Sequence, residues 1–80
     1  MTVEIITPEK KLFAGETTMI RLPGSLGSFQ ILNNHAPIVS TLEKGIITIR
    51  QKENNEEINF DILSGLVECK KNKIIILVEV

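Results

Sequence analysis

The sequence is poor in the side chains from which catalytic and nucleic-acid-binding sites are usually built. Its 80 residues include no tryptophan or tyrosine, three phenylalanines, one histidine and one cysteine. A lone cysteine forms neither an internal disulfide nor a metal site by itself, so we expect Cys69 to be a small buried apolar residue. An enzyme needs several titratable groups that converge in a cleft. We therefore expect no catalytic residues, no metal, no cofactor and no small-molecule substrate.

An excess of charge of one sign is also missing. Nine Lys and Arg residues are interleaved with ten Asp and Glu residues, which gives a formal net charge of −1. A nucleic-acid binder needs a basic face that neutralises phosphates, and a single-strand binder also needs aromatic side chains on which bases stack. We therefore expect no nucleic-acid partner.

Long hydrophobic runs are absent as well. The longest, Ile74–Val78, has five residues, whereas a helix that spans a bilayer needs roughly 20. The start of the chain, Met1–Glu4, leads directly into a strand pattern rather than into a secretory signal. We therefore expect any association with a membrane to be indirect, through a partner.

Aliphatic and β-branched residues dominate what is present. There are 13 Ile, 8 Leu and 5 Val residues against 2 Ala, and the six Thr residues raise the number of β-branched side chains to 24. Branching at Cβ favours the pleated surface of a strand over a helix. No apolar period of 3.6 residues extends beyond about two turns. The composition therefore predicts one all-β domain over residues 1–80.

The strands are expected to be short and separated by turn signals. We expect Gly15 to close a short apolar pair at Leu12 and Phe13, and Pro23–Gly24–Ser25 to stop the following strand. Between Glu57 and Ile62, apolar and polar residues alternate as they do on a sheet with one dry face. About eight to ten short strands predict a two-sheet β-sandwich or flattened barrel.

The segment Ile74–Val78 departs from this alternation because it is apolar on both faces. Two explanations are open. The strand is central in a tight barrel, or its outer face is covered by something else, such as a partner subunit.

Five segments, in order along the chain, resemble the motifs of one family. They are Thr7–Glu16, Leu22–Phe29, Asn34–Pro37, Lys44–Arg50 and Leu63–Cys69. Together they resemble the β-sandwich of the epsilon subunit of F-type ATP synthases, including its "LFSGE" and "NHAP" motifs, and the resemblance covers essentially all 80 residues. The helical hairpin that follows the sandwich in this family is expected to be absent. Its roles in braking ATP hydrolysis and binding ATP are therefore not transferred.

The resemblance implies a non-catalytic subunit of the central stalk, or rotor, of a proton- or sodium-translocating F-type ATP synthase. Such a subunit couples the gamma subunit to the membrane c-ring during rotary ATP synthesis. It is a peripheral membrane protein on the cytoplasmic face of the bacterial inner membrane. The alternative is a free-standing β-sandwich that binds a ligand or a protein. It predicts a largely polar exterior with a concave pocket, whereas the rotor hypothesis predicts an apolar patch on one sheet.

The resemblance also implies two contact regions. The positions that match the gamma-subunit interface are Thr7, His35 and Ser40. The loop expected to face the c-ring is formed by Gly24, Ser25, Leu26, Gly27, Ser28 and Phe29, in which the glycines allow tight turns.

Overall fold

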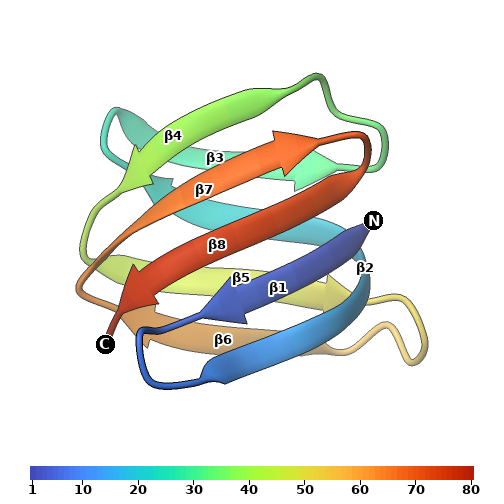
Figure 1. Ribbon diagram of the computed structural model, residues 1–80. Helices are drawn as coiled ribbons and strands as arrows, with labels where there is room; N and C mark the ends of the chain where they lie inside the picture. Colours follow the sequence, from blue (N-terminus) through green and yellow to red (C-terminus); the bar gives the residue numbers. More distant parts are fainter.

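The computed structural model describes residues 1–80 and contains eight strands and no helix (Figure 1). The predicted all-β class is therefore confirmed. None of the chain forms a helix that could cross a membrane. The strands are β1 (Thr2–Ile6), β2 (Lys11–Gly24), β3 (Gly27–Leu32), β4 (Ile38–Leu42), β5 (Gly45–Gln51), β6 (Glu57–Ile62), β7 (Ser64–Lys70) and β8 (Lys73–Glu79).

The long strand β2 joins two layers. Its first half pairs with β1, and its second half pairs with β3 and β5. The register shifts between Thr17 and Met19, where the strand passes from one layer to the other. The first layer continues from β1 through β8 and β7 to β4, and the second contains β3, the second half of β2, β5 and β6. The predicted two-sheet sandwich is confirmed.

The expected break at Gly15 is wrong, because β2 runs without interruption from Lys11 to Gly24. The expected stop at Pro23–Gly24–Ser25 is confirmed, since β2 ends at Gly24 and Ser25 lies in the turn. Gly15 is paired with Val3 of β1. Pro23 is paired with Ser28 of β3, and its carbonyl accepts the backbone N–H of Glu43. The nitrogen side of Pro23 therefore points away from β3, so the missing donor removes no bond from that ladder.

The core lies between the two layers and is almost entirely aliphatic. Cys69 belongs to it, and burial raises the pKa of the Cys69 thiol. A neutral buried thiol is a poor nucleophile, so the expectation of a buried apolar cysteine is confirmed. The fifteen core residues are Met1, Val3, Ile5, Ile20, Leu22, Ile31, Leu42, Ile47, Ile49, Ile62, Val67, Cys69, Ile74, Ile76 and Val78.

The position of strand β8 explains in part why the segment Ile74–Val78 is apolar on both faces. It lies between β1, to which it is parallel, and β7, to which it is antiparallel. The strand is therefore central in its layer, and Ile74 and Ile76 are fully buried. Leu77 points outward and is 49% exposed. No segment of this chain covers that outer face, so the central position accounts for only one face of the strand.

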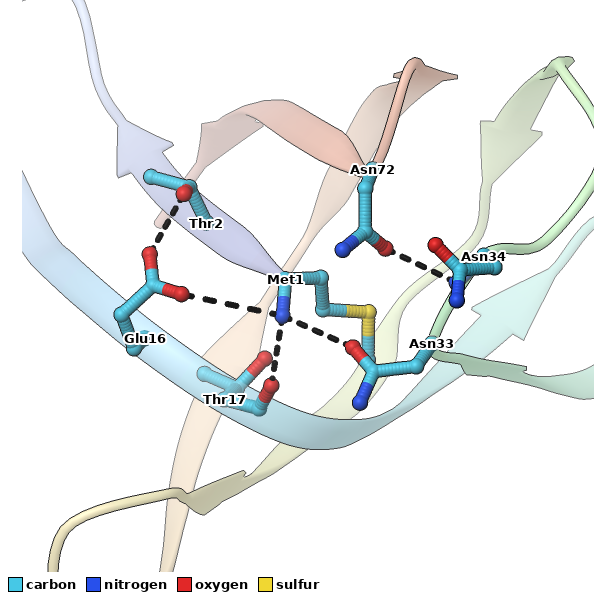
Figure 2. Close-up of polar contacts among 7 residues, drawn as sticks. All are labelled: Met1, Thr2, Glu16, Thr17, Asn33, Asn34 and Asn72. Carbon is cyan, nitrogen blue, oxygen red and sulfur yellow. Dashed lines mark hydrogen bonds and ion pairs between the residues drawn. The ribbon is translucent and has the colours of Figure 1, made fainter.

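One buried hydroxyl leads to a stability prediction. Thr17 is fully buried, and its Oγ1 has no hydrogen-bond partner (Figure 2). Because an unsatisfied buried hydroxyl costs free energy, we expect Thr17→Val to raise the free energy of unfolding by about 1 kcal/mol. Urea denaturation measures this change.

The matched control for this prediction is Thr48→Val. Thr48 is also buried, but its hydroxyl donates to Asn59 Oδ1 at 2.8 Å. This second variant should lose stability. A similar loss in both variants would show that the Thr17 hydroxyl is satisfied in solution and would contradict the prediction.

Candidate interaction surfaces

The outer face of the second layer is mainly polar. Its central row of paired residues runs across four strands and consists of Gln30, Arg21, Thr48 and Asn59. Next to this row, Arg50 Nη2 forms an ion pair with Glu57 Oε2 at 2.8 Å. Polar side chains that are exposed or bonded to one another need no further cover. The same face also carries Leu32, which is paired with Met19 and is 51% exposed, so it is mainly but not wholly polar.

The outer face of the first layer is different, because a row of apolar side chains crosses it. Ile6 of β1 is paired with Leu77 of β8, and Leu77 is paired with Leu66 of β7. Leu66 and Leu77 are 40% and 49% exposed. Beside them is a shallow groove of about 500 Å³, with Pro8 and Gly65 also in its wall. We call Ile6, Leu66 and Leu77 the apolar row.

A second row on the same face mixes apolar and acidic residues. Ile75 is flanked by Glu4 on β1 and Glu68 on β7, and Glu68 is paired with Val39 on β4. Glu4 is neutralised in part by Lys11, whose Nζ lies 3.6 Å from Glu4 Oε2. Val39, on the edge strand, is 65% exposed. The first layer thus carries a face where apolar residues have acidic neighbours, as an interface with a polar rim does.

The β2–β3 connection is a tight hairpin tip. Only Ser25 and Leu26 form the turn, because Gly24 and Gly27 are paired as the last rung of the ladder. A Cβ on Gly24 would lie 2.7 Å from the carbonyl oxygen of Gly27, and Gly27 has a φ of 125°. Both positions therefore require glycine. Phe29 is half-buried and packs against the core, so the predicted loop Gly24–Phe29 is in part strand.

The tip is anchored, and it presents an apolar residue. Ser25 donates its backbone N–H to the carbonyl of Thr41, and the two hydroxyls lie 2.8 Å apart. Leu26 at the turn is fully exposed. The connections β4–β5 and β6–β7 lie at the same end of the sandwich (Figure 1). There Ile46, Leu63 and Val80 line a small groove of about 260 Å³. This end therefore gathers several exposed apolar side chains.

The three residues expected at the gamma interface do not form one cluster. Thr7 follows β1 and is buried, and its hydroxyl donates to the carbonyl of Lys10 at 3.0 Å. His35 lies at the opposite end of the sandwich, in the exposed loop between β3 and β4 (Figure 1). Ser40 is half-buried in β4 and is paired with the core residue Val67. Thr7 and His35 thus lie beyond opposite ends of the apolar face, and Ser40 lies in its edge strand.

The metal-ligating residue types are not gathered at one place. No group of three His, Cys, Asp or Glu residues is placed to hold a metal ion. The single histidine, His35, is exposed, and its Nδ1 donates to the carbonyl of Ala36 at 2.7 Å.

Comparison with known proteins places the chain in a family. The family described as "ATP synthase, Delta/Epsilon chain, beta-sandwich domain" matches residues 1–80. The chain belongs to this ATP synthase family. Relatives named "ATP synthase epsilon chain" include one from Leptospira borgpetersenii, 42% identical over 99% of this chain, and one from Chlorobaculum tepidum, 37% identical over 98%.

The family assignment extends to solved structures. A Tetrahymena thermophila mitochondrial ATP synthase structure, described as central stalk and c-ring, contains a chain that matches all of this one with a TM-score of 0.81 and 26% identity. The match covers 63% of that chain. This chain covers 61% of the Leptospira relative and 88% of the Chlorobaculum relative. The recognition of the family from the sequence motifs is confirmed.

The sequence motifs missed the apolar row. Ile6 and Leu66 come from strands far apart in the chain, and although Leu66 lies within the segment Leu63–Cys69, that motif does not show that its side chain is exposed beside Ile6 and Leu77. The sequence signal for Ile6 and Leu66 was the segment Ile74–Val78, which is apolar on both faces. An exposed leucine on a central strand predicts apolar neighbours on the same face.

Proposed function

We propose that this chain is a non-catalytic subunit of the central stalk of a proton- or sodium-translocating F-type ATP synthase. In this proposal it couples the gamma subunit to the c-ring during rotary ATP synthesis. The observation that carries the proposal is the presence of two separate apolar surfaces, the outer face of the first layer and the end that bears Leu26, on one body. The family match and the stalk structure described above support it.

A mechanical role needs stiffness rather than reactive groups. The core of this sandwich is packed from side chains of both layers, and close-packed interiors resist deformation. Strand β2 is hydrogen-bonded in both layers, so the layers cannot slide past each other without breaking its ladders. A load applied at the tip would therefore be transmitted to the opposite loops with little internal movement.

The apolar face of the first layer is the surface proposed to bind the gamma subunit. Exposed aliphatic rows on a monomer mark contact sites, and a stable joint buries on the order of 800 Å² per partner. Leu66 and Leu77 lie near the centre of this face, where binding energy is usually concentrated. Thr7 and His35, beyond its two ends, and Ser40, in its edge strand, are proposed to belong to the rim of the contact.

The hairpin tip is the surface proposed to face the c-ring. Leu26 is fully exposed and held on a turn that is anchored through Ser25 and Thr41. A short anchored turn loses little conformational entropy when it binds. Association with the membrane is proposed to be peripheral, on the cytoplasmic face of the bacterial inner membrane, and only through the complex.

Co-expression tests the proposal. A tagged version of this chain should co-purify the gamma subunit of the same synthase, and with the c-ring present it should co-purify the ring as well. A Leu26→Asp variant should keep the gamma subunit and lose retention of the ring. Failure of the unchanged, folded chain to retain a folded gamma subunit would contradict the proposal.

A further inference from the structure

Strand β3 is an open edge of the second layer, because it pairs with β2 and with no other strand (Figure 1). In an antiparallel ladder, residue pairs that exchange hydrogen bonds alternate with pairs whose backbone groups point away from each other. Pro23 points away from β3, so the N–H and C=O of its partner Ser28 point out from the free side of β3. Gln30 and Leu32 follow at the same alternation. The backbone groups of these three residues are therefore free at one edge.

This edge lacks the features that usually protect an open strand. Natural edges are blunted by charged side chains, by proline or by a bulge. The segment Gly27–Leu32 contains no charged residue and no proline, and its register with β2 runs without a shift. Ser28, Gln30 and Leu32 are all exposed. An unprotected edge of this kind is a template for a further strand.

The other edge strand of the second layer, β6, carries the protection that β3 lacks. It pairs only with β5. The backbone N–H of Gln51 donates to the carbonyl of Glu56, and alternation from that pair makes Glu57, Asn59 and Asp61 the residues whose backbone groups are free. A second β6 placed against this edge in the antiparallel direction would bring Glu57 opposite Asp61. Like charges directly opposite each other are destabilising.

The edge of β3 is complementary to itself. When Gln30 lies opposite Gln30 of a second copy, in the antiparallel direction, Ser28 lies opposite Leu32, and every free N–H and C=O of both edges is paired. A shift of two residues in either direction leaves some of these groups unpaired. In the same register, Phe29 lies opposite Ile31 on the inner face. Phe29 is only half-buried in the single chain, so this pairing covers more of its ring.

Repulsion between two such edges is small. Of the β2 residues that pair with β3, only Arg21 is charged, and it lies beside Gln30. In the paired edges, the two Arg21 residues would be three strand spacings apart, which is roughly 14 Å. This distance exceeds the Debye length of about 8 Å at physiological ionic strength, so salt screens the two charges from each other.

We propose that the free edge of β3 binds a second copy of this chain, with the two β3 strands antiparallel and Gln30 at the two-fold axis. The inference goes beyond the function proposed above and does not rest on it, because neither the apolar row nor Leu26 belongs to the pairing. A strand of six residues is much smaller than one side of a standard interface, which has roughly 20–30 residues. The association is therefore weak, with a dissociation constant of roughly 0.1–1 mM.

Sedimentation equilibrium from about 0.01 to 2 mM chain tests the proposal. The average mass should rise from 8.9 kDa toward that of two copies. It should not rise further, because a two-fold contact closes after two copies. Gln30→Pro removes a free N–H from the centre of the edge without taking a bond from the ladder with β2, and it should weaken association at least about 10-fold.

Asp61→Pro is the matched control, since it places the same residue at a free position of β6. This variant should associate as the unchanged chain does. A chain that stays monomeric at the highest concentration would overturn the proposal. So would a Gln30→Pro variant that associates as strongly as the unchanged chain.

Cysteine replacement tests the register in a chain that keeps all its backbone donors. Opposite residues of a hydrogen-bonded antiparallel pair have Cα atoms about 5.5 Å apart, a separation that a disulfide can span. Under mild oxidation, Gln30→Cys should therefore form a disulfide-linked dimer at least about 10-fold faster than Asp61→Cys. Cys69 is buried and should not contribute. Equal rates for the two variants would mean that random collision, and not pairing of β3, brings the chains together.

Discussion

Replacing Leu66 and Leu77 together by aspartate is expected to weaken binding of the gamma subunit by at least about 100-fold while the sandwich stays folded. The two side chains are paired across β7 and β8 and form the centre of the apolar row. In the complex, the two new carboxylates would be buried without partners, which costs several kcal/mol. In the free chain, 40% and 49% of the two residues already face water.

A matched variant on the other layer controls for the added charge. Gln30 and Asn59 are exposed residues of the central row on the outer face of the second layer, and Gln30→Asp with Asn59→Asp adds the same two negative charges. This control should bind the gamma subunit within about threefold of the unchanged chain, because distant exposed charges are screened by salt. Isothermal titration with purified gamma subunit measures both variants. Equal weakening in the two variants would mean that the first layer is not the contact face.

The fold class could be predicted because it depends on local composition, but the neighbours of each strand could not. The alternation in Glu57–Ile62 shows which side chains share a face of that one strand. It does not show that Ile6 lies beside Leu77, because that pairing joins the first strand to the last in parallel. The apolar row is therefore a product of topology, and a motif search along the chain does not detect it.

The continuity of β2 was missed for a related reason. Gly15 and Pro23 are turn signals when they are considered with their neighbours in sequence. In the structure, Gly15 has a ladder partner in β1, and the nitrogen of Pro23 points away from β3. Long-range pairing thus overrides local propensity at Gly15, whereas β2 ends one residue after Pro23, as its turn signal predicts.

The contacts of Asn33 and Asn34 could not be predicted from the sequence either. Asn33 Oδ1 accepts a hydrogen bond from the nitrogen of Met1, and the backbone N–H of Asn34 donates to Asn72 Oδ1. Asn34 and Asn72 both have a φ of 61°, a backbone conformation that asparagine tolerates better than most residues. Their pattern predicts turns, but the contact between two turns depends on how the layers stack.

The core of strand β8 gives the second large effect. Ile76 is fully buried and is paired with Ile5 on one side and Val67 on the other. Ile76→Ala should lower the free energy of unfolding by about 2–5 kcal/mol, because it removes buried methyl groups and leaves a cavity. That loss is a large part of the roughly 5–15 kcal/mol that stabilises a typical domain. Urea denaturation at constant pH measures it.

The adjacent residue Leu77 is the matched control, since it lies on the same strand but points outward. Leu77→Ala removes a side chain from a residue that is already 49% exposed, so the unfolding free energy should fall by less than about 1 kcal/mol. The two variants should also respond differently to the gamma subunit. Ile76→Ala changes stability with little change in affinity per folded molecule, whereas Leu77→Ala changes affinity with little change in stability. Equal losses of stability would show that the outer face of β8 is buried in the free chain, which would remove the surface proposed to bind the gamma subunit.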